Sequence, residues 1–265
     1  MLLAGKVAVI HGGGGSIGAA TARVFAREGA RLFLAGRSLP RLERAAAAAR
    51  DAGASDVDIA VIDAMDQADV DTHLDGVAMR AGSVDVALNA VGFDHVQGLA
   101  IADTSLEDYL HPTVGYLTTN FVTAKAASRV MLAQGSGVIL TISTPGARLT
   151  GRGLIGNAAQ SAGLEGFSRA LAGELGPAGV RVVCVRPHAL SDAVDSSYTG
   201  EMFGRIAAAG GIGMDAWLEG LAGSTLMGRL PVLDEVAEYL AFAASDRAAS
   251  MTGGIANLTA GALVD

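Results

Sequence analysis

Short apolar segments alternate with longer amphipathic ones along most of the chain. The segment KVAVIH (residues 6–11) is apolar, rich in β-branched residues and followed by glycines, which is typical of a buried strand. The next segment, SIGAATARVFAREG, places Ile17 and Phe25 on one helical face. In SLPRLERAAAAARDAG, Ser38 is a candidate N-cap and Pro40 falls in the first turn of a second helix. Further strands are expected at residues 30–36, 57–63, 84–92, 136–143, 181–187 and 254–259.

These strand segments are apolar on both faces, and helical segments separate most of them. Such strands favour a parallel sheet that is covered by helices on both sides. We see no Pro/Ser-rich linker, charge block or repeat that would divide the chain. The pattern therefore predicts an α/β fold: a single Rossmann-type doubly wound parallel sheet with helices on both faces, spanning residues 1–265.

The composition narrows the classes of function. Apolar residues make up 51% of the chain and charged residues 17%, which indicates a compact globule. The net charge of −8 offers no basic surface for nucleic acid. The single cysteine, Cys184, fits a reducing compartment. We find neither a signal peptide nor an apolar stretch of about 18 residues, so we expect a cytoplasmic protein without a membrane partner.

Candidate chemistry gathers where the predicted strands end. The sequence IHGGGGSIG (residues 10–18) stands at the first strand-to-helix junction, where glycines let the backbone approach a pyrophosphate and the helix start attracts the anion. Asp63, Asn89 and the pair Ser143-Thr144 close the next three strands after the second. An open α/β sheet binds its ligand at these carboxyl ends, so we expect the site there.

Together these motifs resemble the short-chain dehydrogenase/reductase family across essentially the whole chain. The family's Thr-Gly-x-x-x-Gly-x-Gly appears with His11 and Ser16 at the first and third fixed positions, and its Asn-Asn-Ala-Gly appears as residues 89–92. Its mid-helix Asn matches Asn120, and its Pro-Gly appears as Pro187-His188. The resemblance implies a dinucleotide site formed by Gly12, Gly14, Gly15, Ser16, Ile17, Gly18, Arg37, Asp63, Ala64, Asn89, Ala90, Gly92 and Pro187.

The resemblance also locates the catalytic helix, and there the chemistry departs from the family. Asn157 stands where the family's Tyr belongs, Ser161 where its Lys belongs, and Thr144 where its catalytic Ser belongs. In family enzymes the Tyr exchanges a proton with the substrate oxygen, and the Lys lowers the pKa of the phenol. Asn has no titrating proton and Ser carries no positive charge. We therefore expect a degenerate active site formed by Asn120, Thr144, Asn157, Ser161 and His188.

His188 is included because it is the best titrating substitute near the expected nicotinamide position. Tyr116 shares a helix face with Asn120, but packing between helices explains it better. Asp192 stands where the family often has a Thr that binds the carboxamide. His95 and His111 could touch a substrate, although isolated exposed histidines are common. No His, Cys or carboxylate cluster has metal-site spacing, so we expect no metal.

The end of the second strand carries a signal for the cofactor. Gly36 occupies the position at which an Asp would bind the ribose hydroxyls of NAD, and Arg37 follows it. A guanidinium there suits a 2′-phosphate, so we expect NADP, with NAD possible. Asp63 is placed to accept a hydrogen bond from the adenine, as the family's Asp does. Residues 190–230 correspond to the family's variable substrate lid.

Two classes of function stay open. The first is an NADP-linked dehydrogenase or reductase of a carbonyl or alcohol substrate. The second is a catalytically inactive dinucleotide-binding sensor or oligomer partner. Non-redox enzymes on this fold, such as halohydrin dehalogenases, resemble the chain less because they keep the Tyr and lose the glycine loop. Small residues on the catalytic helix, together with the family's mode of assembly, predict a homodimer or homotetramer.

Overall fold

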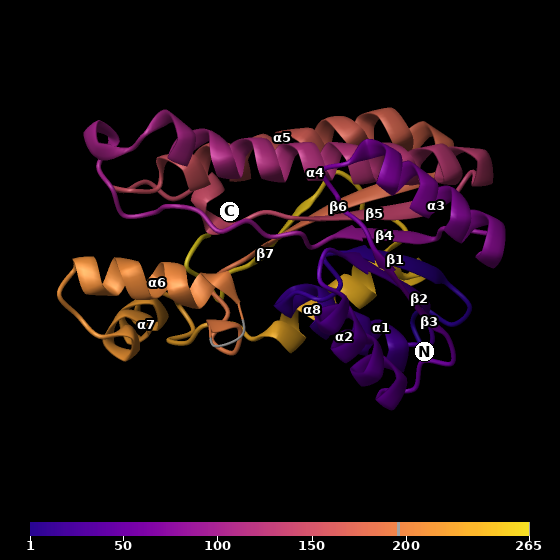
Figure 1. The fold of residues 1–265 in the computed structure, drawn as a ribbon, viewed down its shortest axis with the longest axis horizontal. Coiled ribbons are helices and arrows are strands. Elements are labelled where there is room, and N and C mark those ends of the chain that lie inside the picture. The colour runs from indigo at the N-terminus through magenta and orange to yellow at the C-terminus, as the bar shows by residue number, and fades with distance from the viewer. Residues whose placement is uncertain (195–196, 265) are drawn as a thin grey trace.

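A seven-stranded parallel sheet forms the centre of the protein (Figure 1). The computed structural model describes residues 1–194 and 197–264, so residues 195 and 196 of the expected lid, and Asp265, lie outside the described part. The strands run in the order β3-β2-β1-β4-β5-β6-β7, and every neighbouring pair is parallel. The strands are β1 Val7–His11, β2 Arg31–Gly36, β3 Val57–Val61, β4 Val86–Asn89, β5 Gly137–Ile142, β6 Val180–Pro187 and β7 Ile255–Leu258.

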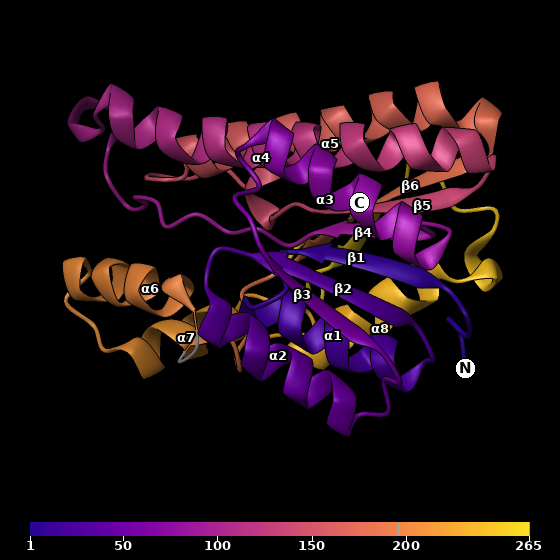
Figure 2. The same ribbon diagram turned by 45° about the vertical axis from the view of Figure 1, so that its right-hand side comes forward.

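Helices cover both faces of the sheet, as Figures 1 and 2 show. One layer holds α1 Ser16–Arg27, α2 Leu39–Asp51 and α8 Leu233–Ala244, and the other holds α3 Gln67–Ala81, α4 Leu106–Gln134 and α5 Ile155–Leu175. Helices α6 Tyr198–Ala209 and α7 Met214–Gly223 form a separate unit that follows β6. Short 3₁₀ turns are η1 Ile101–Asp103, η2 Pro145–Ala147, η3 Gly176–Ala178 and η5 Asp246–Ala248.

The alternation of side chains along each strand divides the core into two halves. Ala8 and Ile10 of β1 belong to the cluster under α1, α2 and α8, whereas Val7 and Val9 belong to the cluster under α3, α4 and α5. Because both faces are covered, a strand in this sheet needs apolar residues at successive positions. The predicted doubly wound α/β fold is confirmed, and each predicted strand is present.

Local signals explain where the helices of the α3–α5 layer begin and end. The Asp66 carboxylate accepts hydrogen bonds from the first-turn amides of Ala68 and Asp69 at 2.8 and 3.1 Å and so caps α3. The Ser105 hydroxyl caps α4 in the same way, by accepting from the Asp108 amide at 3.0 Å. Gly135 ends α4 with a φ of 70°, a left-handed conformation that favours glycine.

Candidate functional site

The glycine turn after β1 packs its backbone against the end of β4. Gly12 has a φ of 78°, and a Cβ there would lie 2.5 Å from the carbonyl oxygen of Ala90. A Cβ on Gly18 would collide with the Gly12 carbonyl oxygen. Both positions therefore require glycine for close backbone approach. Helix α1 begins directly after the turn, at Ser16, with no acidic residue in its first turn, which suits an anion at this helix start.

A cleft of about 420 Å³ opens beside this turn. Eight of the thirteen residues expected to bind the dinucleotide line it: Gly12, Gly14, Gly15, Arg37, Asp63, Ala64, Ala90 and Gly92. Ser16, Ile17 and Gly18 form the first turn of α1, and Asn89 and Pro187 are the last residues of β4 and β6. The cleft thus brings the ends of β1 to β4 into one site, as the sequence predicts.

Two guanidinium groups border the β2 side of the cleft. Arg37 follows β2 directly, and Arg41 lies one turn into α2; both line the cleft and are exposed. A Cβ at Gly14 would lie 2.8 Å from the Cβ of Arg41, so the glycine loop and α2 are in close contact. Asp63, on the far side, accepts a hydrogen bond from the Met65 amide at 2.9 Å. The sequence analysis identified Arg37 but missed Arg41. The start of α2 at Leu39 is what places Arg41 beside the cleft.

Thr144, Asn157 and Ser161 come together beyond the end of β5. The Thr144 hydroxyl donates to Asn157 Oδ1 over 2.9 Å and lies 2.7 Å from Ser161 Oγ. Gln160 Nε2 donates to Ser161 Oγ at 2.9 Å. Asn157 and Ser161 are buried on the inner face of α5, one turn apart. The structure therefore brings together three of the five predicted residues, and their side chains are hydroxyls and an amide.

A histidine from the loop between β4 and α4 completes this group. His95 is 6% exposed, and its Nε2 lies 3.5 Å from Asn157 Nδ2 and 2.8 Å from Gln97 Nε2. Its Nδ1 lies 2.8 Å from the Phe93 carbonyl oxygen. Burial lowers the pKa of His95 below its ordinary value. The sequence offered His95 as one of two exposed candidates, but the structure buries it against Asn157.

His188 and Asp192, which follow β6, both accept hydrogen bonds from backbone amides. His188 Nδ1 accepts from the Ala189 amide at 2.7 Å, and burial lowers the pKa of its imidazole. The carboxylate of Asp192 accepts from the Leu233 amide at 2.9 Å and so satisfies the start of α8. Pro187 pairs with Leu258 at the end of β6. Among the described residues, the histidine in contact with Asn157 is His95.

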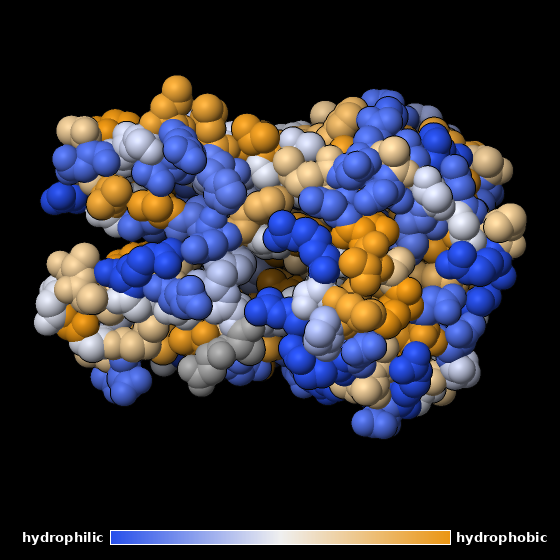
Figure 3. All heavy atoms as spheres, in the orientation of Figure 1, coloured by the Kyte–Doolittle hydropathy of each residue, from blue (hydrophilic) through white to orange (hydrophobic). Residues whose placement is uncertain are grey.

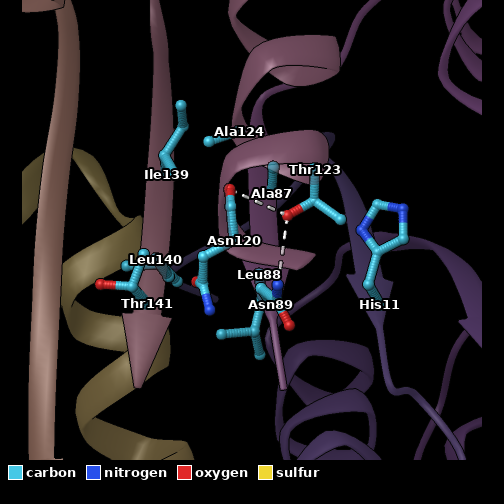
Figure 4. A pocket seen from close by; sticks show the side chains of 10 residues that line it. All are labelled: His11, Ala87, Leu88, Asn89, Asn120, Thr123, Ala124, Ile139, Leu140 and Thr141. Atoms are coloured by element: carbon cyan, nitrogen blue, oxygen red, sulfur yellow. Dashed lines mark hydrogen bonds between the residues drawn. The ribbon is translucent and has the colours of Figure 1, made fainter. Parts of the chain in front are cut away.

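Asn120 lies deeper, beside a cavity of about 10 Å³ between β4, β5 and α4 that polar and apolar side chains line together (Figure 4). Its Nδ2 donates to the Tyr116 carbonyl at 2.9 Å, within α4. Asn89 Nδ2 donates to the Thr123 hydroxyl at 3.3 Å. A space of this size holds about one water molecule. Asn120 therefore lies behind the Thr144–Asn157 group, on the helix next to α5.

His11, at the end of β1, borders the same cavity (Figure 4) and also lines the cleft beside the glycine turn. It is 1% exposed, and its ring centroid lies 5.9 Å from that of His73 on α3, edge to face. Burial, with a smaller contribution from His73, lowers the pKa of His11 to about 3. Burial lowers the pKa of His73 to about 4. Both imidazoles are neutral at physiological pH.

Helix α6 contacts the body of the molecule beside His95. The hydroxyls of Tyr116 and Tyr198 lie 2.7 Å apart, and the Phe93 amide donates to the Tyr116 hydroxyl at 3.2 Å. Arg205 of α6 forms a half-exposed ion pair with Asp94 at 2.8 Å. The space-filling view shows a notch between the α6–α7 unit and the α4–α5 layer (Figure 3). Tyr116 packs under this contact, in keeping with the packing interpretation of the sequence.

A buried ion pair joins α5 to β6. Arg186 of β6 donates from Nε to Glu165 Oε1 at 2.7 Å and from an Nη to Oε2 at 3.1 Å, and both side chains are at most 5% exposed. The Ser143 hydroxyl donates to the same carboxylate at 3.1 Å. Two-pronged, buried contacts of this kind fix relative orientation. They hold α5, and with it Asn157 and Ser161, against the ends of β5 and β6.

Neither a metal centre nor a membrane-spanning helix is present among the described residues. They contain no group of three or more His, Cys, Asp or Glu side chains placed to hold a metal ion. No described helix is long and apolar enough to cross a membrane.

Comparison with known proteins agrees with this fold and site. Residues 13–262 match the family model described as "Enoyl-(Acyl carrier protein) reductase". D-threitol dehydrogenase of Mycolicibacterium smegmatis is 31% identical over 258 residues, 95% of this chain and 90% of the relative. Borneol dehydrogenase, mitochondrial, of Lavandula x intermedia is 28% identical over 95% of this chain and 88% of the relative. A putative short-chain dehydrogenase/reductase from Burkholderia xenovorans superposes with a TM-score of 0.86 at 28% identity, covering 98% of this chain and 97% of its own.

The chain therefore belongs to the short-chain dehydrogenase/reductase family, whose members are oxidoreductases that act on alcohols or carbonyl compounds with a nicotinamide dinucleotide. The structure of an NAD+-bound xylitol dehydrogenase, 23% identical with a TM-score of 0.89 over 98% of this chain and 100% of its own, shares the fold.

Proposed function

We propose that this protein is an NADP-linked oxidoreductase of a carbonyl or alcohol substrate whose active site has lost the family's tyrosine and lysine. The single observation that carries the choice of cofactor is the pair Arg37 and Arg41 on the edge of the dinucleotide cleft. Gly36, at the end of β2, leaves no carboxylate to bind the ribose hydroxyls of NAD. Two guanidiniums suit a 2′-phosphate, because each can donate paired hydrogen bonds to its oxygens.

The rest of the cleft fits the same cofactor. The glycine turn would hold the pyrophosphate against the start of α1, and Gly12 keeps the backbone open where a Cβ would strike Ala90. Asp63, Ala64, Ala90 and Gly92 would surround the adenosine half. When bound, the cofactor supplies or takes up a hydride. The protein contributes the cleft, the orientation of the ligand and the exchange of the proton.

At the reacting end, Asn157 and Ser161 take the positions of the family's acid and cation. An amide can hold a substrate oxygen by hydrogen bonds, but it cannot donate a proton in acid–base catalysis. Acid–base catalysis contributes about 10² to 10⁴ in rate, so a site of this composition is slow unless a nearby group exchanges the proton. Positioning by Thr144 and Asn157 supplies the remaining catalytic effect.

The α6–α7 unit is proposed to close the substrate side. Met202 and Phe203 are buried, and the Phe203 ring lies 4.4 Å from that of Trp217, centroid to centroid. These apolar side chains therefore pack α6 against α7, which favours helix packing over a pocket wall for their role. The relatives that act on borneol and D-threitol suggest cyclic alcohols and polyols as first substrates to try.

The experiment combines binding and turnover. Calorimetric titration with NADPH and NADH measures the two affinities, and the loaded protein is then offered cyclohexanone, camphor and erythrulose, and the corresponding alcohols with the oxidised cofactor. We expect tighter NADPH binding and slow but measurable turnover. Binding without turnover of any probe would favour an inactive dinucleotide-binding protein, and equal affinities would overturn the preference for NADP. A cytoplasmic location belongs to this proposal and stays a prediction.

A further inference from the structure

His95 is held in one orientation by groups on both sides of its ring. Phe93 presents a carbonyl oxygen 2.8 Å from Nδ1, and a carbonyl can only accept a hydrogen bond. Nδ1 therefore carries a hydrogen. The side-chain amide of Gln97 reaches Nε2 at 2.8 Å with its nitrogen, which can only donate. Nε2 therefore presents its lone pair, and the ring is the neutral Nδ1–H tautomer.

The hydrogen bonds around Asn157 give independent evidence that His95 Nε2 carries no hydrogen. Gln160 donates to Ser161 Oγ, and the Ser161 hydroxyl donates to Thr144 Oγ1 over 2.7 Å, because Thr144 uses its single hydrogen on Asn157. Thr144 in turn donates to Asn157 Oδ1, because an amide oxygen accepts only. The Asn157 nitrogen then faces His95 Nε2 over 3.5 Å. This series of hydrogen bonds, which begins at Gln160 on α5, thus also places a donor, Asn157 Nδ2, opposite the unprotonated Nε2 of His95.

The contact between Asn157 and His95 is long enough to be exchanged for a ligand. At 3.5 Å it lies at the outer limit of a hydrogen bond, and catalytic hydrogen bonds often tighten only when substrate is bound. An alcohol that takes the place of the Gln97 amide at Nε2 can donate its hydroxyl hydrogen to His95 Nε2 and accept from Asn157 Nδ2. Both groups would then touch the same oxygen.

We propose that His95 is the catalytic base of this site and that the site acts on alcohols in the direction of oxidation. The inference rests on the proposed function. The O–H bond of the alcohol breaks and its proton passes to His95 Nε2. The C–H hydride leaves for the oxidised nicotinamide as the C–O bond becomes a carbonyl. The imidazolium donates from Nδ1 to Phe93 and from Nε2 to the new carbonyl, and it loses its extra proton to solvent after release.

The charged and titratable groups that face His95 come from three elements. Asp94 precedes it in the loop and is paired with Arg205 of α6, at 2.8 Å. His111 of α4 lies beyond the Phe93 ring. The rings of Tyr116 and Tyr198 lie 6.3 and 6.2 Å from His95, centroid to centroid.

Burial lowers the pKa of His95, whereas the Phe93 carbonyl and Asp94 raise it in part. The imidazole is therefore neutral near pH 7 and ready to take up a proton. Oxidation should therefore fall only at a pH lower than the ordinary pKa of His would give, and should be independent of the His95 charge at neutral and higher pH.

The first test needs neither cofactor nor substrate. Long-range ¹H–¹⁵N spectra of the imidazoles, recorded from pH 5 to 9, identify the His95 signals by their loss in His95→Gln. We expect a neutral ring protonated at Nδ1 at pH 7. An Nε2–H tautomer or an imidazolium at pH 7 would overturn the assignment.

The second test follows turnover of cyclohexanol, borneol and D-threitol with NADP+. In His95→Gln, kcat for oxidation should drop about 10² to 10⁴-fold with little change in KM, and the acid limb of the pH profile should disappear. His111→Gln, on the exposed side of Phe93, is the control and should keep both. If His95→Gln does not fold, by its melting temperature, His95→Asn takes its place.

The outcomes separate the two proposals. Failure of the unmodified protein to bind NADPH overturns the proposed function itself. Binding and turnover with an unchanged acid limb in His95→Gln overturn only the role of His95. An acid limb that disappears in His188→Gln instead would assign the base to His188. Binding of cofactor with no oxidation of the three alcohols also overturns His95 as the base.

Discussion

The side chain of Thr144 and that of Asn157 are joined by a 2.9 Å hydrogen bond across the gap between β5 and α5. A Cβ on Gly146 would collide with the Asn157 amide oxygen, so the backbone of η2 is shaped to admit this amide. The pair therefore belongs to a fitted arrangement. A larger side chain at residue 157 must extend toward His95.

This relationship shapes the prediction for restoring the family's residues. Asn157→Tyr with Ser161→Lys supplies an acid and a cation, and ketone reduction with NADPH should rise by about 10² to 10⁴-fold if the new phenol reaches the substrate. Because His95 occupies the space beyond Asn157, we expect the full gain only when His95→Ala is added. Steady-state reduction of cyclohexanone by the double and triple variants, with melting temperatures recorded, checks this. A gain in neither variant would place the defect elsewhere in the site.

Removing the charge beside the ribose should weaken NADPH binding selectively. For Arg37→Ala or Arg41→Ala we expect a loss of about 1.5 to 3 kcal/mol, roughly 10- to 150-fold in affinity, because a charge-assisted contact to phosphate is removed. NADH affinity should change little. Arg44→Ala is the matched control, because Arg44 is exposed on α2, as Arg41 is, but does not line the cleft. Calorimetry that finds equal losses for both cofactors would contradict the assignment.

Two histidines with lowered pKa values should make stability depend on pH. His11 and His73 have pKa values of about 3 and about 4 in the folded protein, against 6.5 for the ordinary imidazole. Between these values the unfolded chain binds more protons, so stability is complete above pH 6.5 and falls as the pH decreases toward 4. Linkage gives a loss of about 2 kcal/mol for each histidine between pH 7 and pH 5.

Urea unfolding at several pH values measures this slope. His11→Gln or His73→Gln should flatten it, whatever the variant does to absolute stability. The imidazoles of His95 and His188 add to the slope with the same sign, because burial lowers the pKa of each. A wild-type stability that is constant from pH 5 to 7 would be incompatible with the lowered pKa values of His11 and His73.

The outer face of α4 is expected to be an interface between copies of the chain. Val114 and Phe121 are 49% and 52% exposed there, and Gly163 and Gly166 lie exposed on the neighbouring α5. Such a surface lets helices of a second copy approach closely. Phe121→Asp should convert a homodimer or homotetramer into smaller species, as measured by light scattering at micromolar concentration. Met79→Asp, on α3, is the control, and a monomeric wild-type protein would end the idea.

The fold and the dinucleotide cleft follow from local patterns that a single sequence contains. Apolar runs on both faces of each strand require covering helices, and that requirement predicts the parallel sheet without knowledge of any contact. The glycine turn is predictable for a similar reason, because its position between β1 and α1 determines what its backbone faces. Individual cleft residues such as Gly12, Arg37 and Asp63 could therefore be predicted from the sequence.

The contacts that complete the reacting end could not be predicted in this way. His95 lies in a loop without periodicity, 62 residues from Asn157, and no spacing rule connects them. Arg186 lies in a strand whose sequence pattern is apolar, and its burial is made tolerable by the carboxylate of Glu165 from another element. Pairs of this kind depend on how loops and helices pack in three dimensions, which hydrophobic patterns do not specify.

The contacts of α6 bear on how long a ligand stays bound. The hydroxyl of Tyr198 forms a hydrogen bond with that of Tyr116, and Arg205 forms an ion pair with Asp94. Both contacts join α6 to the rest of the protein. We expect both contacts to separate when a product leaves Asn157 past α6. Under the proposed function, the residence time is then governed by the opening of this helix. Salt, which screens the half-exposed ion pair, should shorten that residence time without touching the chemistry.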